Sequence, residues 1–229
     1  MSHSRIFFLA GFCLIFASTQ FGYAGEKEKR FRMVLNVARD CITDKEWDQA
    51  VEALQACLNE PKEILIVISM VNGKPIKASV HAEAERIIKS LPRAGREQYE
   101  TQFGFESQLL LKAADKDEKK LQDLSRRFLY TKAGADGTER LAGGQFDAGR
   151  AKDATKTYAR LLDARPLDKL SPPTLYKAAR ACRDASENGL RDAFWTELRR
   201  QAPVGFRDGD QFITHEAAER ELQRPPAKP

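Results

Sequence analysis

The stretch Gly149–Pro166, GRAKDATKTYARLLDARP, has the spacing that organises the rest of the chain. Ala154 follows Gly149 by five residues, Tyr158 follows Ala154 by four, and Pro166 lies twelve beyond that alanine. A small residue followed by large apolar residues at helical spacing predicts a helix that packs closely on its neighbour. Gly149 then lies in the turn between two helices, where a residue that tolerates left-handed backbone angles is needed.

The longer string GGQFDAGRAKDAT, Gly143–Thr155, has an approximate likeness to a phosphate-binding loop. Such a loop needs a preceding strand, a lysine that reaches the phosphates and a Ser or Thr for magnesium. Here a helix is predicted before it, and Arg150-Ala151 stands where the lysine and hydroxyl belong. We therefore reject a nucleotide site, and we expect Gly143 and Gly144 to mark the end of the first helix of a pair.

The spacing resembles that of the tetratricopeptide repeat (TPR), a helix–turn–helix unit of about 34 residues. One such unit covers residues 31–64 and a second covers 135–168, with Ala38 and Ala142 at the small eighth position. A looser third unit covers 172–203. The fold class predicted is mainly α, with antiparallel TPR-like helix pairs stacked as an α-solenoid and one inserted β-hairpin, because each pair alone leaves an apolar face exposed.

Other elements follow from local signals. Residues 25–62 form the first helix pair, which is broken at TDKE, Thr43–Glu46. Residues 63–79 form the β-hairpin, because Asn72-Gly73 is the pair that best satisfies a type I′ turn. Residues 80–223 form the helical repeat region, in which we expect two short helices, 96–103 and 106–115, separated around Gly104. Residues 224–229 are expected to be a disordered tail.

The N-terminal residues 1–24 have the layout of a secretory signal peptide, with Arg5, an apolar run Ile6–Ala17 and small residues near Ala24. The run is shorter than the roughly 20 residues that span a bilayer, which favours cleavage over the alternative of a retained membrane anchor. The expected location is therefore the periplasm or cell envelope.

Charge and cysteine content narrow the possible functions. The formal charge of +5 falls to +4 when Arg5 is removed with residues 1–24, and both signs are interspersed along the chain. A nucleic-acid partner is not expected, because such proteins gather Lys and Arg on one face. Cys41 and Cys57 are predicted at opposite ends of a helix pair, about 13 Å apart, which is too far for a disulfide. Both are predicted to be small core residues.

Catalytic groups are few. His81 and Glu85 lie one helical turn apart in HAEAE, and with Glu83 they are the only candidate metal ligands, but the second half of a zinc-deaminase signature is absent. Thr214 is expected to cap a last helix that contains His215. We therefore predict no catalytic residue, no metal and no cofactor, and we keep a metal-assisted hydrolase that uses His81 and Glu85 as the alternative.

Several strings, in order, resemble the helical N-terminal region of large exported, planctomycete-type proteins. They are SLPRAGREQYETQFG, LSRRFLYTKAGADG, LSPPTLYKAARACRDA and GFRDGDQFITHEAAERELQR, together with the stretch around Ala154. In that family a TPR-like region precedes a PQQ-like (BamB-like) β-propeller. No blade pattern occurs here, so the sequence represents a free-standing module or a truncated form, and no quinone function is carried over. The resemblance implies an envelope location and a scaffold or docking role.

These observations predict a non-enzymatic, exported helical-repeat scaffold that binds another protein, such as a β-propeller or envelope protein, and no small-molecule substrate. In TPR proteins the partner lies in the concave groove made by the first helices. In the register above, Arg39, Tyr176, Arg180 and Arg183 face that groove and suit a carboxylate-bearing segment.

Overall fold

The computed structural model describes residues 24–225, and this part of the chain is mainly helical, with ten α-helices and two small hairpins. The predicted signal peptide lies outside the described residues except for Ala24, as do residues 226–229 of the predicted tail. The helices are α1 (Ala24–Asp44), α2 (Trp47–Leu58), α3 (Val80–Ser90), α4 (Arg93–Ala114), α5 (Glu118–Phe128), α6 (Lys132–Asp147), α7 (Ala151–Ala164), α8 (Pro172–Asp184), α9 (Asn188–Gln201) and α10 (His215–Gln223). The strands are β1 (Leu65–Val71), β2 (Lys74–Ser79), β3 (Gly205–Asp208) and β4 (Gln211–Thr214), and a short 3-10 helix covers Leu167–Lys169.

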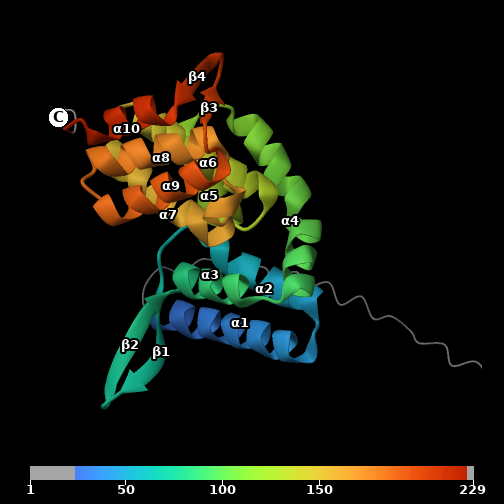
Figure 1. Ribbon diagram of the computed structural model, residues 1–229. Helices are drawn as coiled ribbons and strands as arrows, with labels where there is room; N and C mark the ends of the chain where they lie inside the picture. The colour runs from blue at the N-terminus through green and yellow to red at the C-terminus, as the bar shows by residue number, and fades with distance from the viewer. Residues whose placement is uncertain (1–23, 226–229) are drawn as a thin grey trace, which may run out of the picture.

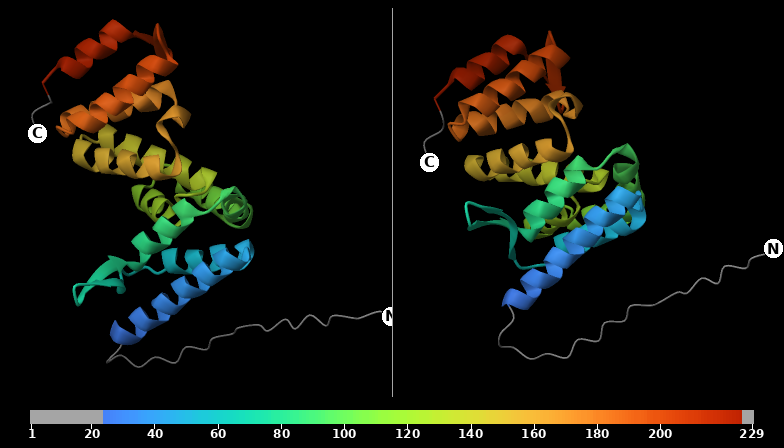
Figure 2. Two further views of the ribbon diagram at one scale, coloured as in Figure 1. Left: turned by 60° about the horizontal axis from the view of Figure 1, so that its bottom comes forward. Right: turned by 90° about the horizontal axis from the view of Figure 1, so that it is seen from below.

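The helices form an elongated stack, in which most helices pack on the next one along the chain, while α4 packs on α2 and α6 as well as on α5, and α10 packs on α8 (Figures 1 and 2). Three pairs are antiparallel hairpins with the same turn: α1–α2, α6–α7 and α8–α9. One residue in each turn has a positive φ, namely 62° at Lys45, 76° at Gly149 and 64° at Ser186. The predicted break after the first helix and the predicted turn at Gly149 are both confirmed.

The hydrogen bonds of these turns are also alike. In the second pair the Gly149 N–H donates to the Phe146 carbonyl and the Arg150 N–H to the Gln145 carbonyl, each at 2.9 Å. This is the Schellman arrangement that satisfies the last carbonyls of a helix. The equivalent bonds close the other two pairs: Lys45 to Ile42 and Glu46 to Cys41, Ser186 to Arg183 and Glu187 to Cys182.

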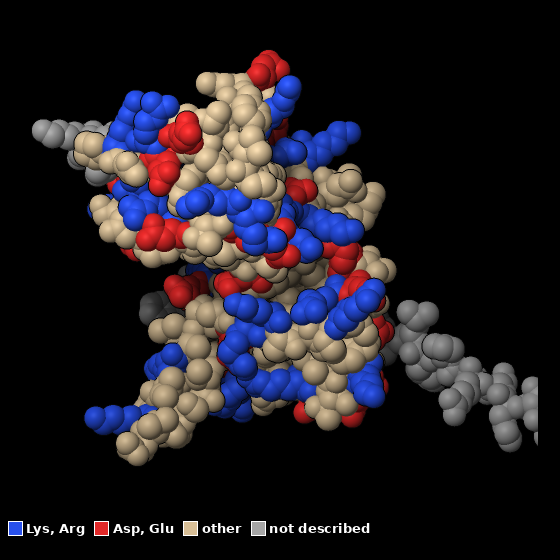
Figure 3. All heavy atoms as spheres, viewed as in Figure 1, with Lys and Arg blue, Asp and Glu red and all other residues tan. Residues whose placement is uncertain are grey.

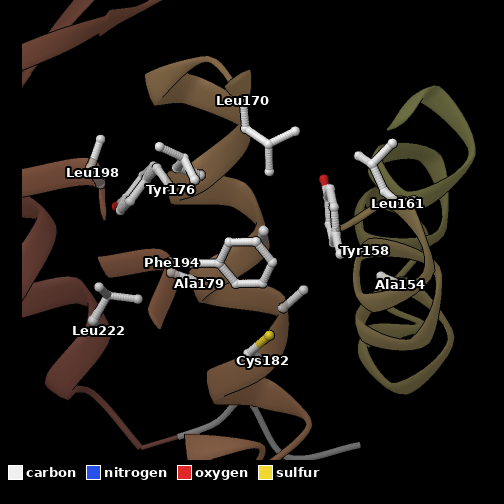
Figure 4. Close-up of a cluster of buried hydrophobic side chains, with 14 of the residues drawn as sticks. Ala154, Tyr158, Leu161, Leu170, Tyr176, Ala179, Cys182, Phe194, Leu198 and Leu222 are labelled. Carbon is white, nitrogen blue, oxygen red and sulfur yellow. The ribbon is translucent and has the colours of Figure 1, made fainter. Parts of the chain in front are cut away.

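An alanine lies seven residues before each positive-φ residue. Ala38, Ala142 and Ala179 are all fully buried, at the positions where the small side chain lets two helix backbones approach. Large side chains then fill the seam on either side. Between the second and third pairs the Tyr158 ring of α7 meets Phe194 of α9 with the ring centroids 6.3 Å apart, beside Ala179 and Cys182 of α8 (Figure 4).

Helix α4 is continuous, so the predicted division into two helices at Gly104 is wrong. Tyr99 on its first half is buried in the core of α1–α3, and Leu111 on its second half is buried in the core formed with α5 and α6. Phe103 packs against both cores. Because each half is held by tertiary contacts, the helix tolerates the roughly 1 kcal/mol cost of an internal glycine.

The prediction that Gly143 and Gly144 mark the end of a helix is also corrected. Helix α6 runs on to Asp147, so Gly143 and Gly144 lie inside it rather than at its end. A glycine in a helix interior costs about 1 kcal/mol relative to alanine, yet the helix persists because its opposite face, including Ala142, is buried.

The β1–β2 hairpin has the predicted type I′ turn, with positive φ at Asn72 (51°) and Gly73 (74°). A second hairpin, β3–β4, was not expected, so the prediction of a single hairpin is corrected. In its turn only Gly209 has positive φ (60°), as in a type II′ turn. Its strands have four residues each, too short for alternation to be read.

The three described cysteines are buried and unpaired, as predicted for Cys41 and Cys57. Burial raises the pKa of the Cys57 thiol to about 12 and that of Cys182 to about 11. Both thiols therefore remain protonated near neutral pH and act as small apolar core groups.

The shared turn geometry predicts that two substitutions change the free energy of unfolding in opposite directions. Gly149→Ala lowers the free energy of unfolding by about 1 kcal/mol, because a side chain is strained at this φ even though the site has open space. Ser186→Gly raises it by about 0.5–1 kcal/mol, because it relieves the same strain. Urea unfolding followed by circular dichroism measures both, and two effects of the same sign would contradict the shared turn geometry.

Candidate functional site

A concave surface lies along the first helices of the second and third pairs. It is a cavity of about 920 Å³ between α6, α8, the α4–α5 turn and the end of β3. We call it the α6–α8 groove. The residues that line it include Asp115, Lys116, Glu118, Asp136, Glu139, Arg140, Gly143, Gly144, Asp147, Arg150, Thr174, Lys177 and Asp208.

Gly143 and Gly144 form part of the groove surface. A Cβ at Gly144 would meet no atom within 4 Å, and one at Gly143 would approach only the ends of Lys177 and Tyr158, at 3.6 Å and 3.9 Å. No packing contact in the described residues therefore requires a glycine at 144. The effect of the pair is to leave a turn of helix backbone uncovered, where a partner can approach the main chain closely.

Most charges of the groove are neutralised by ion pairs. Arg150 donates both of its terminal nitrogens to the Glu118 carboxylate, at 2.8 and 2.6 Å. Lys177 pairs with Asp147 at 2.7 Å, and Arg165, beside the groove, pairs with Asp136 and with Glu139. Glu139 also accepts a hydrogen bond from the Thr174 hydroxyl. These pairs join α5 to the α6–α7 turn, α6 to α7, and α6 to α8.

Four charged side chains of the groove have no ion pair or hydrogen bond among the described residues: Asp115, Lys116, Arg140 and Asp208. All four are exposed. Arg140 lies on α6, while the two aspartates lie at the α4–α5 turn and on β3. A guanidinium without a partner binds a carboxylate well, because it can donate two parallel hydrogen bonds.

The four residues predicted to line the groove lie elsewhere. Arg39 on α1 donates to Glu83 of α3 at 2.6 Å and to Asn36. Tyr176 is 6% exposed and its ring meets Phe206 of β3 at 5.2 Å. The prediction that these side chains share one open surface is therefore corrected.

Helix α10 contacts the remaining two. Arg183 is 8% exposed and donates to the Glu221 carbonyl, while Arg180 lies 3.8 Å from the Glu221 carboxylate and over the Phe146 ring. The helix contributes Ala218 and Leu222 to the core and otherwise presents polar residues, after a start capped by Thr214 as predicted. It thus packs on α8 through its apolar side and has a largely polar outer face.

The candidate metal ligands have separate partners. The His81 ring Nε2 lies 2.7 Å from the Glu60 carbonyl. Two arginines hold Glu83, and Arg160 binds Glu85 at 2.6 Å. No group of three potential metal ligands occurs in residues 24–225. The three side chains are therefore parts of the contacts between helices rather than a common site.

Two carboxylates of this group differ in environment. The hydrogen bond from Arg86, with that from Arg39, holds the pKa of Glu83 below its ordinary value. Burial raises the pKa of Glu85, and the Arg160 guanidinium opposes that rise. Glu83 therefore joins α1 to α3 as a carboxylate, whereas Glu85 joins α3 to α7 in a drier environment.

The sequence carried one signal for the groove that our prediction did not use. Two adjacent glycines without a turn requirement indicate exposed backbone, but at 143–144 they were assigned to a helix end. Arg140 and Lys177 carried no such signal, because isolated basic residues occur throughout the chain.

Comparisons of the chain with protein-family models, with curated proteins and with solved structures found no match. Among the described helices, none combines the length and apolar character that a membrane crossing requires.

The environment of Glu83 predicts a pH-dependent loss of stability. Glu83→Gln lowers the free energy of unfolding at pH 7 by about 2 kcal/mol, because hydrogen bonds from two arginines lose their charged acceptor. The folded-state pKa is below the ordinary value of 4.5, so the contribution is complete above that pH and is lost as the pH falls through the folded pKa. Urea unfolding of both proteins between pH 7 and pH 3 measures this; a difference that grows on acidification would contradict it.

Proposed function

We propose that the protein is an exported, non-enzymatic helical-repeat scaffold of the cell envelope that binds a segment of another protein in the α6–α8 groove. The uncovered backbone at Gly143 and Gly144 carries this proposal, because a packed helix surface gains nothing from two interior glycines. The signal-like N-terminus and the resemblance to envelope proteins support the location.

The finer assignment of the fold belongs to the same proposal. The three hairpins α1–α2, α6–α7 and α8–α9 are TPR-like units that form an α-solenoid. Their support is the alanine seven residues before a left-handed residue in each pair, with the same turn hydrogen bonds. The groove then lies on the first helices α6 and α8, where TPR proteins bind partners, although α3–α5 interrupt the repeat.

The groove chemistry describes the segment that fits. Arg140 binds a carboxylate of the partner, and Asp115 or Asp208 accept from a cation or an N–H group nearer either end. The segment crosses Gly144 with its backbone or a bulky side chain. A β-propeller or another envelope protein is the partner class that the family resemblance implies.

The alternatives are weaker. A metal-assisted hydrolase would need His81, Glu83 and Glu85 to converge, and each is used in a different contact between helices. A scaffold retained by its N-terminal apolar run would keep the same groove, so anchoring changes its location and not its binding chemistry.

A side chain that fills the groove should weaken binding of the partner without lowering the free energy of unfolding. Gly144→Leu places a side chain over the uncovered backbone and also replaces a poor helix former. We expect the affinity for the partner to fall at least about tenfold, while the free energy of unfolding stays level or rises by about 0.8 kcal/mol. The partner is captured from an envelope extract of the native host, identified, purified, and titrated with each variant by calorimetry.

Gly189→Leu is the matched control. Gly189 is also an exposed helical glycine with open space around it, but it lies on α9 away from the groove. Its substitution should leave affinity unchanged. Equal binding by wild type and Gly144→Leu would refute the contact over Gly144. Arg140→Glu tests the groove independently, with a tenfold or greater loss expected, and full binding by both variants would refute the groove assignment.

A further inference from the structure

The β1–β2 hairpin projects from the stack of helices and is largely unpacked (Figure 1). Only its base joins the core: Ile66 is buried, and the Val80 N–H donates to the Ile64 carbonyl at 2.8 Å. Along the two strands, large apolar side chains are between 43% and 61% exposed: Leu65 at the base, and Ile68, Met70, Val71 and Ile76 beyond it. A two-stranded hairpin of this kind is marginal alone in water, and clustered exposed apolar groups mark a binding surface.

The exposed apolar groups lie on both faces of the hairpin. Met70 pairs with Pro75, and their side chains share one face with the Val67–Lys77 pair. Val71 pairs with Lys74, and Ile76 pairs with Ser69, on the other face. A protein packed on one face would leave the other face in water. A lipid interface surrounds the hairpin and covers both faces.

The charges of the hairpin are of one sign. Lys74 and Lys77 are the only charged residues from Leu65 to Ser79, one on each face. Elsewhere on the face shown in Figure 3, cations and acids are interspersed, whereas the projecting hairpin is mainly uncharged with blue cations. Lysine stems can lie along apolar groups while their ammonium groups reach phosphates. Apolar groups with cations and no acids match an anionic lipid surface.

The start of the described chain lies on the same side. Helix α1 begins at Ala24, and the Glu28 carboxylate near this start accepts a hydrogen bond from the Val67 N–H of β1 at 3.4 Å. The apolar run Ile6–Ala17 precedes that helix in the sequence. The end of α1 that follows the apolar run is therefore the end that contacts the hairpin.

From these observations we infer that the β1–β2 hairpin inserts into the headgroup region of an anionic phospholipid membrane, with Lys74 and Lys77 at the phosphates. This surface is separate from the α6–α8 groove and does not depend on it. The membrane orients the scaffold and leaves the groove free.

A tryptophan on the hairpin tests the inference. The full chain carrying Met70→Trp is mixed with vesicles of phosphatidylcholine and phosphatidylglycerol, with and without brominated acyl chains. We expect its fluorescence to shift to shorter wavelength and to be quenched by the brominated lipid, relative to the wild-type signal of Trp47 and Trp195. Because the apolar N-terminal run is the same in all variants, differences between the hairpin variants report the hairpin itself.

Phe105→Trp is the matched control, since Phe105 is 71% exposed and belongs to α4, a helix on the other side of the stack from the hairpin (Figure 1). We expect neither shift nor quenching there. Equal quenching at both positions, or none at Met70→Trp, would overturn the inference. If Met70→Trp does not keep the helical circular dichroism of wild type, Ile76→Trp on the other face replaces it with the same two outcomes.

Variants of the two lysines test whether the charge of the lipid contributes to binding. Lys74→Gln and Lys77→Gln should each weaken the hairpin signal about fivefold, which corresponds to about 1 kcal/mol per cation at an anionic surface, and vesicles of phosphatidylcholine alone should give a weaker signal than the mixed vesicles. An unchanged signal in both comparisons would refute the charge match.

Sedimentation without vesicles tests whether a second copy of the chain covers the hairpin. A dimer that Met70→Ser abolishes, together with no quenching by lipid, would assign the hairpin to self-association instead.

Discussion

The close approach of two helices at a fully buried alanine is the constraint on which the rest of the structure depends. At Ala38, Ala142 and Ala179 a larger side chain would push the paired helices apart. The left-handed residue follows each alanine by seven positions. The second helix of each pair therefore begins at the same distance along the chain from the buried alanine. The α6–α7 and α8–α9 pairs pack directly on each other, whereas α3–α5 lie between them and the α1–α2 pair.

The stack determines where a binding surface can exist. Packing of α7 on α8 and of α6 on α5 leaves one side of α6 and α8 uncovered, and that side becomes the groove. Ion pairs such as Arg165 with Glu139 and Lys177 with Asp147 hold its walls, while Arg140 has no partner among the described residues. Helix α10 also packs on α8, where it contacts Arg183, but none of its residues lines the groove.

The two proposed surfaces have different physical origins. The groove is polar, concave and built on a rigid core, and its interior glycines reduce helix propensity to keep backbone accessible. The β1–β2 hairpin is convex, apolar and joined to the core only through its base. A scaffold with both can hold a protein segment while lying against a lipid surface, because the two surfaces belong to different parts of the stack.

The sequence by itself determined the elements whose signals are local. The helix pairs followed from apolar spacing, and the α6–α7 turn followed from Gly149. The β1–β2 hairpin followed from Asn72-Gly73, and the start of α10 followed from Thr214. Only the tertiary structure decided the continuity of α4 through Gly104, the place of Gly143 and Gly144 inside α6, and the burial of Tyr176 and Arg183 beneath β3 and α10. These outcomes depend on contacts between residues distant in sequence. The packing energy of those contacts exceeds the cost of a glycine in a helix and the cost of removing an arginine side chain from water.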